Sequence, residues 1–157
     1  MKMYKSLGFR IPHGSLLTWS TQERHEHGAM IREIQEASME VLEQKKLNIV
    51  LNDFVNECRS VFNEMLSDVR LFGSYARGDY NDDSDIDLMV ILDMNDAGVR
   101  KSRHDICRVA AMLELKHGVT ISPVLYGKEE YASRKSFGFC KKVEMEGVSQ
   151  CVGQIYA

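Results

Sequence analysis

The sequence predicts an α/β domain in which a small mixed sheet is covered by helices. Three observations support this fold class. A helical stripe of apolar residues precedes the first strand candidate, an apolar strand follows an acidic loop, and a long helical segment separates that strand from a third. A helix in that place provides the crossover connection that two parallel strands of one sheet require. The chain has 157 residues, which is enough for one domain with a core.

The beginning of the chain sustains neither a strand period nor a helix period. We expect residues 1–28 to form a flexible N-terminal extension. Residues 29–157 are expected to form the folded domain, with its core at about 52–126.

Two helices are predicted before the sheet. The first runs from Ala29 to Leu47, where glycine and proline are absent. Its apolar face consists of Ile34, Ala37 and Val41. The second begins with Asn52 or Asp53 as its N-cap, because a short polar side chain can accept a hydrogen bond from a free amide of the first turn. Its continuous apolar stripe consists of Phe54, Val55, Cys58, Val61, Phe62 and Met65.

The sheet begins with a short strand, 69–72, which ends at a glycine, and a second strand covers 86–92. Asp96 is expected to cap the crossover helix, and Gly118 stands where a C-terminal glycine would end it. The core face of this helix is expected to comprise Val99, Ile106, Val109, Ala110 and Leu113.

A third strand is predicted at 119–126. Short helical turns are expected between Lys128 and Gly147, and the tail from Val148 either adds a strand or remains loose.

Composition excludes several classes of protein. The formal net charge is only -3, so the sequence does not predict a strong electrostatic attraction to nucleic acid. The sequence contains no run of 18 apolar residues, so it predicts no membrane-spanning helix. The N-terminal residues do not resemble a secretory signal. The four cysteines are widely scattered, which favours reduced thiols in a cytoplasmic protein over disulfides or a zinc site. The oligomeric state is left open.

Gly73 and Ser74 follow the first strand and open a short turn that extends to Arg77. A glycine lacks the Cβ that would block the close approach of a ligand, and the amides of such a turn favour phosphate oxygens. The Ser74 hydroxyl adds a donor. On its own, a Gly-Ser pair after a strand is common and favours a plain turn.

Asp85 and Asp87 are two positions apart at the second strand, so both carboxylates are expected on one face. Two neighbouring carboxylates repel each other unless a cation lies between them. Magnesium prefers a few carboxylates together with phosphate oxygens and waters, so the pair predicts a site for Mg²⁺ and a nucleoside triphosphate. An isolated Asp-x-Asp also fits a solvated acidic loop.

Together, Gly73-Ser74, ten intervening residues and Asp85-Ile86-Asp87 resemble the signature of the nucleotidyltransferase superfamily. The fuller pattern, Gly-Ser-x-Ala-Arg-Gly followed by Ser-Asp-Ile-Asp-Leu, resembles the minimal nucleotidyltransferases, the antitoxin-type partners of HEPN toxins. The resemblance implies a nucleotidyltransferase fold. It also implies transfer of AMP from ATP to a protein hydroxyl, a tyrosine of a HEPN-type toxin, as in type VII-like antitoxins.

The resemblance implies a role for each residue of the motif. Gly73 and Ser74 would contact the β- and γ-phosphates, and Asp85 and Asp87 would hold magnesium and serve catalysis. Arg77 would orient phosphate, although a surface arginine among aspartates is an equally good interpretation.

One feature of the family pattern is missing. Active members carry a third carboxylate on the strand after the crossover helix, whereas residues 118–126 contain no Asp or Glu. Ser122 or Thr120 stands near the expected place, and a neutral hydroxyl is a poor base. The flanking carboxylates Glu114, Glu129 and Glu130 are the candidates to substitute for it.

Three functions remain open. The first is the protein nucleotidyltransferase described above. The second is a catalytically weakened nucleotide-binding module that neutralises a partner by direct binding, which the missing carboxylate favours. The third is a small-molecule nucleotidyltransferase, which the short segment after the third strand disfavours because a wall for the acceptor is missing.

Overall fold

The computed structural model describes residues 21–151. It divides into two units, one that ends at Glu43 and one that begins at Gln44, and each is described by itself. Helix α1 (Thr21–Phe62) spans the boundary between them.

In the first unit, residues 21–43 are helical. Of the expected extension, residues 1–20 lie outside the described residues and residues 21–28 belong to α1. The predicted apolar face on this part of the helix is exposed, since Ile34 and Val41 are 56% and 54% accessible. Because this part of α1 buries no apolar stripe, the sequence of residues 21–28 shows no helical period of apolar residues.

The predicted break between two helices near Asn52 and Asp53 is wrong, because α1 is one continuous helix. Asp53 does not cap a helix. Its carboxylate oxygen Oδ2 lies 2.8 Å from Lys116 Nζ and 2.8 Å from His117 Nε2. Asp53 therefore links α1 to Lys116 and His117, which end the helix that precedes the third strand.

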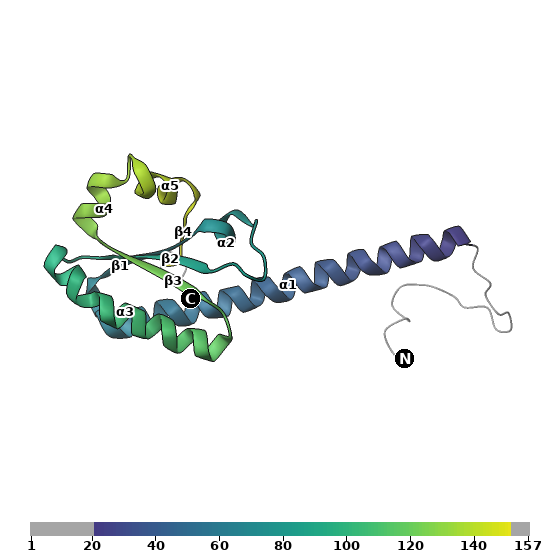
Figure 1. Ribbon diagram of the computed structural model, residues 1–157, viewed down its shortest axis with the longest axis horizontal. Helices are drawn as coiled ribbons and strands as arrows, with labels where there is room; N and C mark the ends of the chain where they lie inside the picture. Colours follow the sequence, from purple (N-terminus) through teal and green to yellow (C-terminus); the bar gives the residue numbers. More distant parts are fainter. Residues whose placement is uncertain (1–20, 152–157) are drawn as a thin grey trace. The chain divides into compact units, whose positions relative to one another are not determined.

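The second unit contains a sheet of four strands: β1 (Leu66–Phe72), β2 (Ile86–Leu92), β3 (Ile121–Gly127) and β4 (Val148–Ser149). Their order in the sheet is β3-β2-β1-β4 (Figure 1). β1 runs antiparallel to β2 and β4, whereas β2 and β3 are parallel and α3 (Asp96–His117) connects them. The mixed sheet and the helical crossover confirm the predicted fold class.

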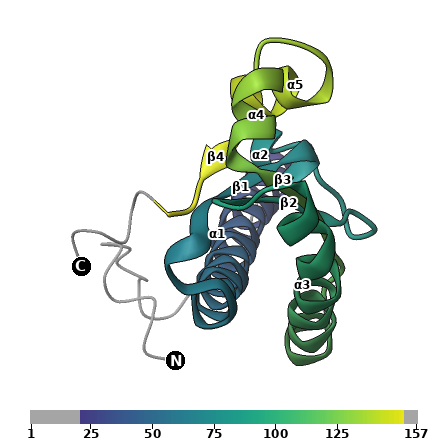
Figure 2. The same ribbon diagram turned by 90° about the vertical axis from the view of Figure 1, so that its left-hand side faces the viewer.

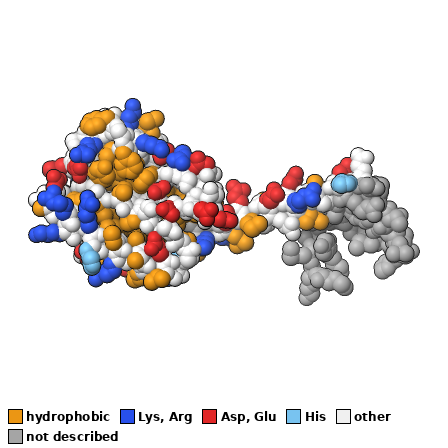
Figure 3. All heavy atoms as spheres, in the orientation of Figure 1, with side chains coloured by type: hydrophobic (Ala, Val, Ile, Leu, Met, Phe, Trp, Pro, Cys, Tyr) orange, Lys and Arg blue, Asp and Glu red, His pale blue; other side chains and the backbone are white. Residues whose placement is uncertain are grey.

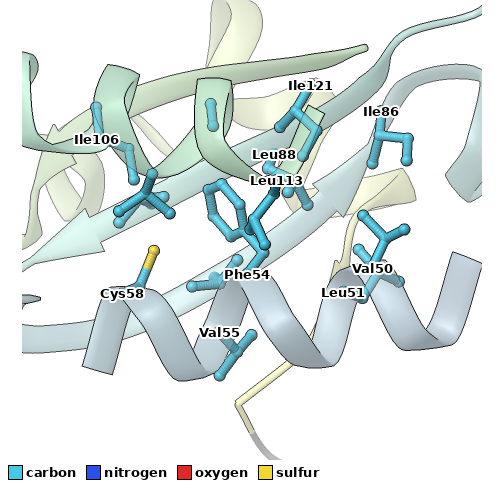
Figure 4. Close-up of a cluster of buried hydrophobic side chains, with 14 of the residues drawn as sticks. Val50, Leu51, Phe54, Val55, Cys58, Ile86, Leu88, Ile106, Leu113 and Ile121 are labelled. Atoms are coloured by element: carbon cyan, nitrogen blue, oxygen red, sulfur yellow. The ribbon is translucent and has the colours of Figure 1, made fainter. Parts of the chain in front are cut away.

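Alternation along β2 divides the unit into two layers on opposite faces of the sheet. Ile86, Leu88, Val90 and Leu92 belong to a core with α1 and α3, and Figure 4 shows Phe54 and Cys58 of α1 within this core. Met89 and Ile91 pack with residues of α4 (Lys128–Arg134) and α5 (Gly138–Glu146). Figure 2 shows α4 and α5 on one side of the sheet, and α1 and α3 on the other.

The crossover helix α3 begins one residue away from the predicted cap. The Asn95 side chain accepts a hydrogen bond of 3.0 Å from the Gly98 N–H, so Asn95 is the N-cap and Asp96 is the first helical residue. Gly118 ends the helix in a left-handed conformation with φ of 63°, as predicted. The five residues predicted for its core face are all buried.

All four cysteines are free thiols. Across residues 21–151, none of the helices combines the length and the apolar character that crossing a bilayer requires.

Phe54 tests the layer between α1 and the sheet, because its side chain is fully buried. We expect Phe54→Ala to lower the free energy of unfolding by about 3–5 kcal/mol, since the cavity cannot fully collapse. Urea denaturation followed by circular dichroism measures the change. Leu115→Ala is the control, because Leu115 is 90% exposed, and it should change stability by less than about 0.5 kcal/mol. Equal effects of the two substitutions would contradict this assignment of the core.

Candidate active site

The end of β1 lies against the beginning of β2. Phe72 is the register partner of Asp87, and Gly73 follows it with φ of +74°. A Cβ at Gly73 would collide with the Asp87 carboxylate. Glycine is therefore required at this position for two reasons, the left-handed backbone and the space that the carboxylate occupies.

The two aspartates stand at the start of β2. Asp85 immediately precedes the strand, and Asp87 is its second residue. Ser122 on β3 is the register partner of Asp87, and its hydroxyl donates a hydrogen bond of 3.0 Å to Asp85 Oδ2. The structure thus brings two carboxylates and one hydroxyl together at one end of the sheet.

The charge of this cluster is unfavourable in the absence of a cation. Burial, and then the negative charge of Asp85, raise the pKa of Asp87 above its usual value. Within residues 21–151, neither aspartate has an ion-pair partner. Asp85 and Asp87 are thus two carboxylates without a cationic partner, and they lie beside Gly73, which has no Cβ. This set of oxygen donors fits Mg²⁺ bound to phosphate.

The predicted substitutes for a third carboxylate do not complete this site. In the part of the chain that the structure describes, no group of three metal-binding side chains is present. Glu114 accepts a hydrogen bond of 2.8 Å from the Ile121 N–H, and Glu130 pairs with Arg134 at 3.3 Å. Glu129 is exposed on α4. Ser122 therefore lies beside Asp85 and Asp87, where the resemblance led us to expect a third carboxylate.

Arg77 lies at the end of the short helix α2 (Gly73–Arg77). Its guanidinium is 3.2 Å from Asp79 and 3.3 Å from Glu146 of α5. The charge of Arg77 also lowers the pKa of Asp87, although burial and Asp85 outweigh it. Arg77 is thus close enough to the carboxylates to influence them, and two acidic side chains hold it in place.

Two residues of α5, Lys142 and Glu146, also belong to this region, and no sequence motif marks them. The charge of Glu146 raises the pKa of Asp87, and the charge of Lys142 lowers it, so both side chains contribute to the electrostatics of Asp87. They follow the motif by more than fifty residues and form no recognisable pattern with it. The packing of α5 against α2, β1 and α4 brings them to the site.

The loop between α2 and β2 is held by its own polar side chains. The Asn81 side chain accepts a hydrogen bond of 3.0 Å from the Asp83 N–H, and the Ser84 hydroxyl accepts one of 2.9 Å from the Asn81 N–H. Tyr75 and Tyr80 stack with ring centroids 4.3 Å apart. These contacts define the path by which the chain reaches Asp85.

Comparison with known proteins identifies this arrangement. Residues 51–140 match the family model described as "Nucleotidyltransferase domain", which covers more than half of the chain. The chain belongs to the nucleotidyltransferase family. The match includes all of β1, β2 and β3 and therefore Gly73, Ser74, Arg77, Asp85, Asp87 and Ser122.

Two relatives from Methanocaldococcus jannaschii each bear the name "Putative protein adenylyltransferase". One is 32% identical over 110 residues, which are 70% of this chain and 98% of the relative. The other is 34% identical over 97 residues, which are 62% of this chain and 90% of the relative. A crystal structure titled as that of a "putative nucleotidyltransferase" from Sulfolobus solfataricus superposes with a TM-score of 0.51 at 23% identity. That superposition covers 69% of this chain and 83% of the other. It shows that the two proteins share a fold.

Asp87→Asn should raise the melting temperature in metal-free buffer at neutral pH. Because the folded protein raises the pKa of Asp87, the ionised carboxylate destabilises the fold. This destabilisation is present above the folded pKa and disappears as the pH falls toward the ordinary value of 3.8. Melting curves at pH 7 and near pH 3.5 should show the gain only at the higher pH. A variant that is less stable than the wild type at pH 7 would contradict the repulsion.

Gly73→Ala and Gly78→Ala separate backbone strain from collision. Both glycines have positive φ, but only a Cβ at position 73 meets the Asp87 carboxylate, whereas the space around Gly78 is open. Each substitution should cost about 1–2 kcal/mol of stability for the left-handed backbone. The substitution at Gly73 should cost more in urea denaturation. Equal losses would show that the site tolerates a side chain there.

Proposed function

We propose that this protein transfers a nucleoside monophosphate, AMP from ATP, to a hydroxyl group of another protein in the cytoplasm. The observation that carries the proposal is that two carboxylates, Asp85 and Asp87, lie beside Gly73 without a cationic partner. The names of the two archaeal relatives support a protein as the acceptor. The resemblance of the motif to antitoxin-type nucleotidyltransferases supports a tyrosine of a HEPN-type toxin as that acceptor.

Each part of the site has a role in this reaction. Asp85 and Asp87 would hold Mg²⁺, which, when bound, neutralises charge on the triphosphate. Gly73 and Ser74 would position the β- and γ-phosphates through backbone amides and the Ser74 hydroxyl. Arg77 would add a positive charge near the phosphates. The acceptor oxygen would form a bond to the α-phosphorus as the bond to the bridging oxygen breaks and pyrophosphate leaves.

With Ser122 in place of a carboxylate, removal of the proton from the acceptor hydroxyl would be the slow step of the reaction. A serine hydroxyl is a poor base at neutral pH, and here its O–H donates a hydrogen bond to Asp85. A missing general base slows a reaction by a factor of about 10² to 10⁴. We therefore propose a slow enzyme, in which positioning of the nucleotide provides most of the rate enhancement.

The double variant Asp85→Ala/Asp87→Ala tests the metal-dependent binding of nucleotide. It should lose the magnesium-dependent part of ATP binding in calorimetry, because each carboxylate neutralises part of the charge of the metal. Wild-type protein that binds ATP equally with and without magnesium would contradict the proposal. Incubation with labelled ATP and a candidate partner, followed by mass measurement of the partner, tests the transfer itself.

Ser122→Asp should raise the rate of transfer, by up to the factor of about 10² to 10⁴ that a general base provides. It places a carboxylate beside Asp85 and opposite Asp87, where the family pattern has one. Ser122→Asn is the matched control, since it has a similar size and no charge. A rate that Ser122→Asp leaves unchanged would show that another group already serves as the base.

The same serine favours a second candidate function, a binding module that neutralises its partner without chemistry. In that case the Asp85→Ala/Asp87→Ala variant would neutralise the partner fully, and no partner would gain mass. Loss of neutralisation together with loss of the added nucleotide would establish the enzyme.

A further inference from the structure

An open groove runs along the outer edge of β3, between α3 and α4. Its volume is about 480 Å³, and four successive residues of the strand, 123–126, line it. β3 is the edge strand of the sheet, so this side of its backbone faces no other strand. We refer to the space between residues 123–126, Arg100, Arg103 and Glu130 as the β3-edge groove.

The part of β3 that lines this groove contains a complete outward-pointing pair of backbone hydrogen-bonding groups. The Ile86 N–H donates to the Thr120 carbonyl, so by the alternation of a parallel ladder the odd-numbered residues of β3 point their peptide groups outward. Glu114 accepts the outward N–H of Ile121, and Pro123 has none. The N–H and carbonyl of Leu125 are the first complete outward pair, and Leu125 lines the groove.

The β3-edge groove begins one residue along β3 from the candidate active site. Ser122 donates its hydrogen bond to Asp85, and the next residue, Pro123, already lines the groove. A strand rises about 3.3 Å per residue, so the groove extends for roughly 13 Å along β3 from the carboxylates. A chain that lay in the groove would therefore lead directly to the reacting phosphate.

The charge of the groove favours an acidic occupant. Arg100 and Arg103 are three positions apart on α3, both are exposed, and within residues 21–151 neither has an ion-pair partner. Of the acidic lining residues, Glu130 already pairs with Arg134, and Asp96 lies in the first turn of α3, where the helix dipole stabilises it. Figure 3 shows apolar side chains gathered on this face, with basic side chains beside them.

We propose that the β3-edge groove docks an extended segment of the acceptor protein as an added strand. Leu125 would pair with the backbone of the segment, and Arg100 and Arg103 would bind an acidic side chain about four residues from the hydroxyl that enters the site. The inference rests on the proposed function, because it assigns the substrate of the same site. It defines that substrate as an extended segment with an acidic residue at a fixed distance from the acceptor hydroxyl.

Two synthetic peptides test the charge selection in the absence of nucleotide. Both carry a central tyrosine in a β-forming sequence, and they differ only in having Glu or Lys four residues to either side. Fluorescence anisotropy should show that the wild type binds the Glu peptide about five- to tenfold more tightly, as two partly exposed charge pairs allow. Arg100→Glu/Arg103→Glu should reverse the preference. Lys101→Glu/Arg108→Glu, the same change of charge outside the groove, should retain it.

Hydrogen exchange measured by mass spectrometry tests the added strand. The Glu peptide should protect the Leu125 amide in the wild type. Equal binding of the two peptides, binding of neither, an unchanged preference in Arg100→Glu/Arg103→Glu, or an unprotected Leu125 would each overturn the proposal. Both peptide measurements are made without nucleotide, so their outcome does not depend on the transfer reaction. A failure of nucleotide transfer with intact peptide selection would therefore count against the proposed reaction and not against the docking.

Discussion

Strand β2 pairs with a neighbour on each side, and its register determines which side chains meet at the site. Phe72 of β1 and Ser122 of β3 both stand opposite Asp87. A slip of one residue would turn Asp87 into the core that Ile86 and Leu88 now fill. Burial of Ile86 and Leu88 on one face of β2 therefore holds the Asp87 carboxylate on the other face. The contact between Gly73 and this carboxylate depends on the same strand pairing.

The site also depends on elements far from the motif in sequence. Glu146 at the end of α5 holds Arg77, and the charges of Lys142 and Glu146 influence Asp87. The packing of α4 and α5 on this face of the sheet therefore does more than cover it. A triphosphate bound beside Asp87 would be surrounded by charges of both signs. Arg77 would attract it less strongly than a free arginine would, because Arg77 forms ion pairs with Asp79 and Glu146.

The parts of the fold that were predicted from sequence are those where burial leaves a pattern. The core face of α3 is one example, because its apolar residues recur at helical spacing. β2 is another, because a continuous apolar run after Asp87 is typical of a strand that is buried on both faces. The continuity of α1 was not predictable, since its exposed beginning has no stripe and Asp53 resembles a cap. The motif located Asp85 and Asp87, but Lys142 and Glu146 come to the site through tertiary packing alone. The role of Glu114 depends on one hydrogen bond that no pattern predicts.

That hydrogen bond has a consequence for assembly between copies of the chain. An exposed edge strand is a template on which further strands can add, and this is a common route to aggregation. On β3 the Glu114 carboxylate occupies the Ile121 N–H, and Pro123 provides no donor at the next outward position. Two copies of β3 therefore cannot pair along their full length. The sheet resists unlimited growth into a fibril while one short stretch of its edge stays open.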